Sequence, residues 1–320
     1  MIAVEPNVFH DFLSKHDESQ WADVLERLWP SIHPVDQVAT KIWFTFWPLK
    51  LARELRSSDD EVQIAKRLQL DGKYRLEQQV DSSIDYFVGS RFWGGVKQAV
   101  LEYAESTQGP ESIDLEKHIR LIASRVAETK RVEGSFVVGI TAVGVMVLQQ
   151  VGVAALASSL SQAFEIRIHQ SAEQLLRQRR AKSGDGLRGL LGLGTKDYRV
   201  TYDESQSDGS FRALIGQDLS MASATDTRNY KGKDHRKIAG PVPAECRSGA
   251  CGYCWIGVIG GKENLSAVTE FERKRLRHFG YLAPEGPTET HPHVRLACQS
   301  KCYGNISIVV PPWNGVLEGR

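Results

Sequence analysis

The pattern of apolar and polar positions changes after residue 197. Before it, apolar residues recur every three or four positions over long stretches, which is typical of helices with one buried face. After it, short β-branched and aromatic runs bounded by turn residues indicate strands. The pattern predicts a multidomain chain with an all-α domain over residues 1–182, a glycine-rich linker over 183–197 and an α+β domain over 198–320.

The helices of the first domain are predicted from apolar spacing, proline stops and helix caps. Pro30 ends the first helix, and Ser112 or Asp114 is placed to cap the last. The expected helices cover Phe9–Trp29, Asp36–Arg56, Asp59–Gln69, Lys73–Tyr103 and Asp114–Arg131.

One segment of the first domain allows two interpretations. Gly134–Ala163 carries no charge and is long enough to span a bilayer. The adjacent Gln149 and Gln150 are costly in lipid, and basic residues flank both ends, so that the positive-inside rule selects no orientation. We favour a buried helix, or a hairpin broken near the paired glutamines; a membrane-spanning helix is the alternative.

In the C-terminal domain, two runs around a polar turn predict a hairpin, Tyr198–Asp203 and Phe211–Gly216. Two further strands are expected at Trp255–Gly260 and Asn305–Val310. Short helices are expected at Asp218–Thr225 and Thr269–Arg277, with a long polar run, Asp226–Pro243, after the first of them.

Four cysteines carry the clearest chemical signal of the chain. Cys246, Cys251 and Cys254 have a C-x4-C-x2-C spacing, and Cys298 follows 44 positions after the third. This spacing is typical of plant-type 2Fe–2S ferredoxins. Such a cluster needs four thiolates, and a single short loop can supply only three of them. Glycines between the ligands allow the backbone amides to approach the cluster sulfurs closely.

The stretch from about residue 198 to 313 therefore resembles a 2Fe–2S ferredoxin domain of the β-grasp type, through CRSGACGYC and RLACQ. The resemblance implies one 2Fe–2S cluster. It implies that Cys246 and Cys251 hold the outer iron and that Cys254 and Cys298 hold the inner one. Loop amides from Ser248 to Tyr253 would tune a potential of about −400 mV. The helical domain in front of it resembles no family that we recognise.

This region departs from the plant-type pattern in three respects. The gap before Cys298 is longer, the polar run Asp226–Pro243 precedes the cluster loop, and 16 Lys and Arg stand against 13 Asp and Glu from Tyr198 onward. Plant-type ferredoxins are typically acidic and dock on basic reductases. Because this region is slightly basic, docking of an acidic ferredoxin surface on a basic reductase is not expected here.

Other uses of the same residues are weighed against the cluster. A structural zinc site would use the four cysteines, but zinc ribbons usually pair two C-x2-C knuckles. An odd number of cysteines without a secretory signal argues against disulfides. We expect the fifth, Cys302, to pack as a small apolar residue, with a redox or substitute-ligand role as the alternative. His291 and His293 are expected to be surface loop residues.

Composition narrows the function further. A net charge of +1 gives no bulk attraction to nucleic acid, and the N-terminus has no apolar leader, so that a reducing cytoplasm is expected, with membrane association as the alternative. No nucleotide or flavin fingerprint is visible. We therefore expect an electron carrier between a reductase and an acceptor oxidoreductase, and not an enzyme in its own right. A regulatory protein whose cluster state alters partner binding by the helical domain is the alternative.

Overall fold

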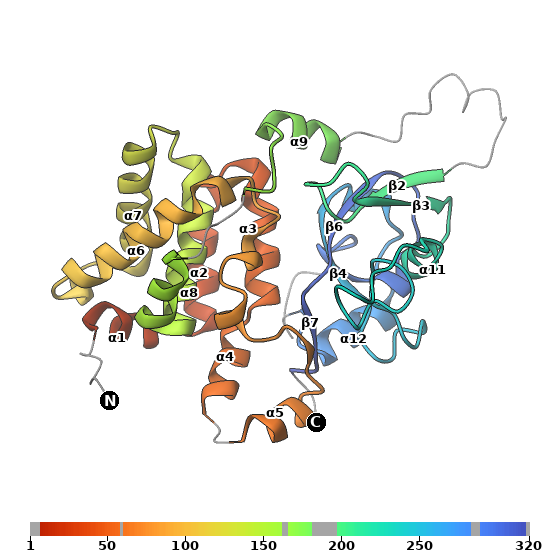
Figure 1. The fold of residues 1–320 in the computed structure, drawn as a ribbon, viewed down its shortest axis with the longest axis horizontal. Coiled ribbons are helices and arrows are strands. Elements are labelled where there is room, and N and C mark those ends of the chain that lie inside the picture. Colours follow the sequence, from red (N-terminus) through yellow and green to blue (C-terminus); the bar gives the residue numbers. More distant parts are fainter. Residues whose placement is uncertain (1–6, 58–59, 162–165, 181–196, 283–288, 318–320) are drawn as a thin grey trace. The chain divides into compact units, whose positions relative to one another are not determined.

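The computed structural model describes residues 7–57, 60–161, 166–180, 197–282 and 289–317 (Figure 1). The chain forms two compact units: unit 1 comprises Met1–Ser57 and Arg75–Ser171, and unit 2 comprises Ser58–Tyr74 and Ala172–Arg320. Helices dominate unit 1 and a mixed sheet lies in unit 2, which agrees with the predicted order of an α domain and an α+β domain. Residues 58–74 and 172–180, which we expected in the helical domain, belong to unit 2. The expected linker lies outside the described residues except for Asp197.

Unit 1 is built from helices that are shorter than the sequence suggested. Phe9–Trp29 is not one helix, because Asp17 starts a new helix through a capping box with Gln20. Asp36–Arg56 is likewise interrupted at Pro48. The observed helices are α1 (Val8–Ser14), α2 (Glu18–Leu28), α3 (Pro34–Phe46), α4 (Leu49–Arg56), α6 (Trp93–Ser106), α7 (Leu115–Lys130) and α8 (Ser135–Ser158).

Two other helix predictions had different outcomes. Lys73–Tyr103 was wrong over most of its length, because short 3-10 turns precede α6, which begins only at Trp93. The last prediction is confirmed: α7 begins after Asp114, whose side chain accepts a hydrogen bond from the Lys117 N–H. His33 is the N-cap of α3, accepts from the Val35 N–H and stacks on Phe136.

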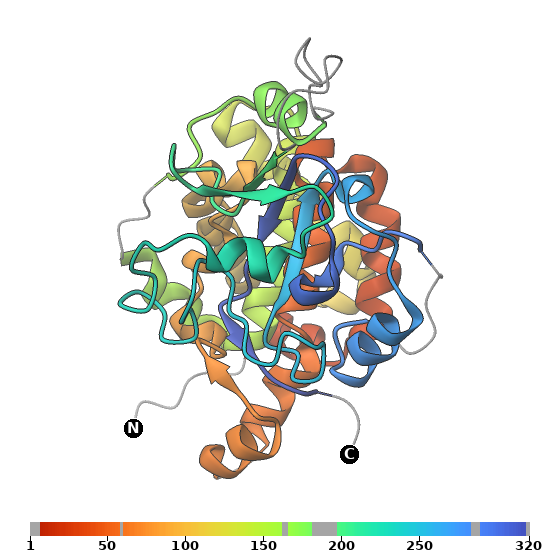
Figure 2. The same ribbon diagram turned by 90° about the vertical axis from the view of Figure 1, so that its right-hand side faces the viewer.

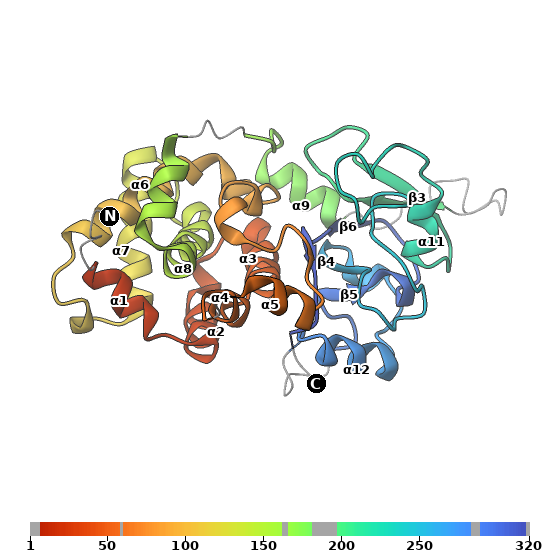
Figure 3. The same ribbon diagram turned by 60° about the horizontal axis from the view of Figure 1, so that its bottom comes forward.

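The apolar segment forms the central helix of unit 1. α8 packs against α3, α6 and α7 (Figure 3). It is long and apolar enough to cross a membrane, and 78% of its most apolar window is buried inside the protein, as in the core helix of a soluble protein. The Trp21 indole donates to Gln149 Oε1 at 2.6 Å, and Gln150 Nε2 donates to the Trp47 carbonyl at 2.8 Å. The paired glutamines are therefore satisfied by protein partners. The helix breaks two residues later, at Gly152 (φ 79°).

Unit 2 contains a five-stranded mixed sheet with the order β3-β2-β6-β4-β5 (Figure 2). β2 and β6 run parallel, and the other pairs are antiparallel. The strands are β2 (Asp197–Thr201), β3 (Ser210–Leu214), β4 (Trp255–Gly260), β5 (Val294–Leu296) and β6 (Ile306–Val309). The helices are α5 (Glu61–Arg67), α9 (Ala172–Arg180), α11 (Leu219–Ala224) and α12 (Glu270–His278).

The predicted hairpin, the two further strands and both short helices of this domain are confirmed to within a few residues. Asp218 and Thr269 cap α11 and α12. The sequence analysis missed β5 and a small two-stranded sheet. In that sheet β1 (Asp71–Gly72) pairs antiparallel with β7 (Trp313–Asn314), so that two segments far apart in the sequence meet in unit 2.

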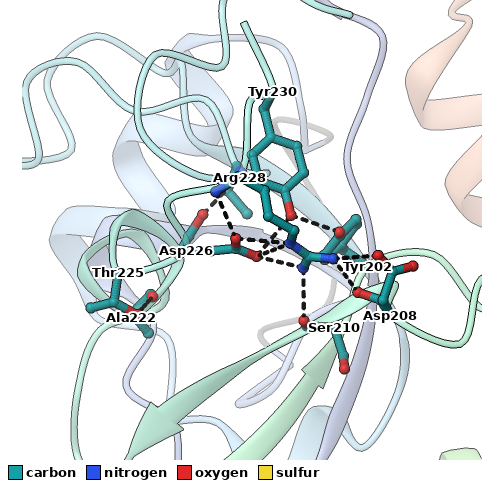
Figure 4. Close-up of polar contacts among 10 residues, drawn as sticks. Tyr202, Asp208, Ser210, Ala222, Thr225, Asp226, Arg228 and Tyr230 are labelled. Atoms are coloured by element: carbon teal, nitrogen blue, oxygen red, sulfur yellow. Dashed lines mark hydrogen bonds and ion pairs between the residues drawn. The ribbon is translucent and has the colours of Figure 1, made fainter.

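The polar run 226–243 forms no helix or strand and is held by side chains instead (Figure 4). The Arg228 guanidinium bonds to Asp226 at 2.6 Å and to Asp208 at 2.8 Å, and its Nη2 also donates to the Ser210 carbonyl. The Tyr230 hydroxyl donates to the same Asp226 carboxylate at 2.7 Å. This network ties the start of the run to the β2–β3 hairpin.

Close packing of α8 gives a test of the unit 1 core. A Cβ added at Gly144 would lie 2.9 Å from Val96 Cγ1, whereas one at the exposed Gly94 of α6 would meet nothing within 4 Å. We expect Gly144→Leu to lower the free energy of unfolding by about 1–3 kcal/mol through overpacking. The matched change Gly94→Ala should raise it by up to about 1 kcal/mol. Urea denaturation of both variants checks this, and an unchanged midpoint for Gly144→Leu would contradict the packing described.

Candidate metal centre

The four predicted ligands come from two elements of unit 2 that the sheet brings together. Cys246 and Cys251 lie on the loop between α11 and β4, and Cys254 immediately precedes β4. Cys298 lies in the 3-10 turn Ala297–Gln299, directly after β5. Since β4 and β5 are antiparallel and Trp255 pairs with Leu296, the loop and the turn meet at one end of the sheet. The Ala297 N–H donates to the Cys254 carbonyl at 2.8 Å.

The backbone of the loop folds toward its first cysteine. Both the Ser248 and the Cys251 N–H groups donate to Cys246 Sγ at 3.4 Å. The fold requires left-handed backbone at Arg247 (φ 52°), Gly249 (φ 82°) and Gly252 (φ 78°). Glycine adopts this conformation without steric cost. Two loop amides therefore point at the sulfur of Cys246.

Helix α12 packs against the outside of the loop. A Cβ at Gly249 would lie 2.9 Å from the Phe271 ring, and one at Gly252 would lie 3.0 Å from the Phe279 ring. Arg275 donates to the Gly249 carbonyl at 3.3 Å and also to the Ala250 carbonyl. Larger residues at these two positions would push the loop away from α12. The glycines therefore allow the loop to pack closely on the helix, in addition to adopting the left-handed backbone.

The thiols influence one another in two pairs. Burial raises the pKa of Cys246, but hydrogen bonds from the Ser248 hydroxyl, the Cys251 thiol and the two loop N–H groups outweigh it and lower that pKa to about 6. Burial raises the pKa of its neighbour Cys251. In the second pair, the hydrogen bond between Cys254 and Cys298 raises the pKa of Cys254 and lowers that of Cys298. Cys246 and Cys298 also interact electrostatically, which links the two pairs.

Among the described residues, no group of three or more His, Cys, Asp or Glu side chains is placed to hold one metal ion. A zinc site needs four ligands around a single ion, and a 2Fe–2S cluster takes two thiolates on each of two irons. The loop and the turn that carry the four cysteines meet at one end of the sheet, and these thiols are the donors that either kind of site uses.

The other residues weighed in the sequence have structural partners. Cys302 is fully buried, and its thiol contacts the Gly304 carbonyl at 3.2 Å; burial raises its pKa. It packs as a small residue, as predicted. His291 and His293 lie in the loop before β5, as expected, and both are half-buried. His293 Nδ1 lies 2.9 Å from the Val258 carbonyl.

Two supports of the site were missed in the sequence. The Tyr253 hydroxyl donates to Asp71 at 2.7 Å, and the same carboxylate lies 2.5 Å from His235 Nε2. Burial raises the pKa of Asp71, but these two hydrogen bonds outweigh it and leave the pKa below its usual value. No sequence signal marked Asp71, because it lies far from the loop in the chain.

The second support is the buried ion pair of Glu272 with Arg295. Both side chains are fully buried, Arg295 contacts both carboxylate oxygens at 2.9 Å, and the Leu296 N–H donates to the same carboxylate. The pair links α12 to β5 three residues before Cys298. One indication of this pair was present in the sequence, because RLACQ places a charged residue, Arg295, three positions before Cys298 in an otherwise apolar run.

No protein-family model, curated protein or solved structure matches the chain significantly.

The lowered pKa of Cys246 gives a test on cluster-free protein. Because only the thiolate is alkylated, the rate of iodoacetamide addition at Cys246 should rise through pH 6 and level off above it. Mass spectrometry of digested samples assigns the modified cysteine, and Cys246→Ser is the control. A midpoint near the ordinary value of about 8.5 would show that the loop amides do not stabilise the thiolate.

The buried ion pair gives a second test. Arg295→Met leaves Glu272 buried without its partner, and we expect a loss of about 3–5 kcal/mol in the free energy of unfolding. The matched change Arg212→Met removes a surface pair with Asp197, in which the arginine side chain is 71% exposed, and should cost less than about 1 kcal/mol. Equal losses in the two variants, measured by urea denaturation, would contradict the role given to the buried pair.

Proposed function

We propose that unit 2 is a β-grasp ferredoxin-type domain that carries one electron on a 2Fe–2S cluster. The observation that carries this proposal is that the loop with Cys246, Cys251 and Cys254 meets the turn with Cys298 at one end of the sheet, with two loop N–H groups directed at Cys246 Sγ. A 2Fe–2S cluster requires four such thiolates, two on each iron. The sheet order, with its first and last long strands parallel in the centre, supports the β-grasp assignment.

The residues of the chain have distinct roles in this proposal. Cys246, Cys251, Cys254 and Cys298 would hold the two irons, and the cluster, when bound, supplies one-electron redox chemistry. The N–H groups of Ser248 and Cys251, which now point at Cys246 Sγ, favour the more negative reduced state. Phe271 and Phe279 pack on the loop glycines and limit the access of water from that side.

The protein would pass electrons from a reductase to an acceptor oxidoreductase, without a reaction of its own. A reducing compartment such as the cytoplasm would keep the thiols available for the cluster. A helical domain, the linker 183–197 and the ferredoxin-type domain would make up the chain, with 58–74 and 172–180 packed as part of the last.

An EPR-monitored redox titration of anaerobically purified protein tests this function. We expect a rhombic one-electron signal that titrates at low potential, near −400 mV. Cys298→Ser should abolish or strongly alter the signal, whereas Cys302→Ser, which changes a cysteine outside the four, should keep it. Stoichiometric zinc with no iron and no EPR signal would overturn the proposal.

A further inference from the structure

The exposed surface around the cluster loop combines apolar and basic side chains. We call this surface the loop face and define it by Met221, Arg247, Phe271, Lys274 and Arg275. Arg247 lies on the loop itself, and its Nη1 is 3.2 Å from Met221 Sδ on α11. On the other side, Phe271 and Arg275 of α12 contact the loop at Gly249. Lys274 is exposed on the same face of α12, because residues three and four apart are neighbours on a helix.

Two large apolar side chains of this face are open to solvent. Phe271 is 50% exposed and Met221 is 43% exposed, although each also contacts the loop or its arginine. Exposed aromatic residues that rest on a rigid base are frequent anchors of protein interfaces. They flank the loop that carries Cys246, which is the exposed one of the candidate ligands.

The charges around these side chains are mainly positive. Arg247, Lys274 and Arg275 lie on the face, and Lys301 is exposed beside α11, where its backbone pairs with Asp218. No carboxylate of the described residues pairs with the Lys274 or Lys301 side chain.

Four carboxylates lie near these cations in the sequence or the fold. Asp218 caps α11 and Glu272 is buried against Arg295. Glu270, 3.8 Å from Arg273, and Glu245, next to Cys246 in the sequence, are exposed. The local field is therefore basic, in line with the excess of Lys and Arg over this part of the chain.

We propose that the loop face docks an acidic redox protein, whose carboxylates meet the Lys and Arg side chains while an apolar contact covers Phe271 and Met221. This inference rests on the proposed electron-transfer function and adds the chemistry of the partner. Complementary charge steers the encounter, and a small apolar contact keeps the complex transient, as repeated electron delivery requires. A partner of this kind is opposite in charge to the basic reductases of acidic ferredoxins.

The test uses two soluble haem proteins of opposite charge, acidic cytochrome b5 and basic cytochrome c. Binding to the full-length protein is measured by calorimetry at low and high ionic strength, and oxidation of the reduced cluster by each probe is followed by stopped flow. We expect cytochrome b5 to bind more tightly than cytochrome c, and salt to weaken that binding. The double variant Lys274→Glu/Lys301→Glu should bind and react about tenfold more weakly with cytochrome b5 at low salt.

Two further variants locate the effect. Lys262→Glu, at the opposite end of β4 about 20 Å from Cys254, makes the same charge change per site and should alter binding little. Phe271→Ala should weaken binding without changing its salt dependence. Preference for cytochrome c, or an equal loss with Lys262→Glu, would overturn the docking proposal. Each variant is first checked for its EPR signal: a missing signal in the unaltered protein defeats the proposed function, whereas a normal signal with charge-independent binding defeats only the docking surface.

Discussion

The antiparallel pairing of β4 with β5 is the constraint on which the candidate site depends. Cys254 precedes β4 and Cys298 follows β5. Because Trp255 pairs with Leu296, the two thiols lie close enough to share a hydrogen bond, although 44 positions separate them in the sequence. A slip of one residue would turn every side chain of β5 to the other face of the sheet. The Glu272 carboxylate opposes such a slip, because it accepts from both the Arg295 side chain and the Leu296 N–H.

The cluster loop is held from several sides by residues that are distant in sequence. Arg275 of α12 donates to the Gly249 carbonyl of the loop. Asp71 of β1 accepts a hydrogen bond from the Tyr253 hydroxyl. A loop fixed in this way holds the N–H groups of Ser248 and Cys251 toward Cys246 Sγ. In the proposed function this backbone is the part of the site that is already in place before a cluster binds.

Much of unit 2 could be predicted from sequence, because its signals are local. Trp255–Gly260 is an aromatic and β-branched run that ends at Gly260 and Gly261, and Asp218 and Thr269 are helix caps. The strand and the two helices were therefore predicted near their true ends. The three-residue β5 was missed because so short a run carries no periodicity. In unit 1, capping by Asp17 and the 3-10 turns before Trp93 divided helices that apolar spacing alone had joined. Asp71 could not be found, since its role comes only from a tertiary contact.

In the proposed function, four cysteines hold one cluster of two irons and two sulfides. The decisive measurement is iron and acid-labile sulfide analysis of anaerobically purified protein, together with Mössbauer spectra of the 57Fe-labelled sample. We expect two irons and two sulfides per chain, with two ferric thiolate sites when oxidised and one ferric and one ferrous site when reduced. One metal ion per chain, or iron without sulfide, would rule the cluster out.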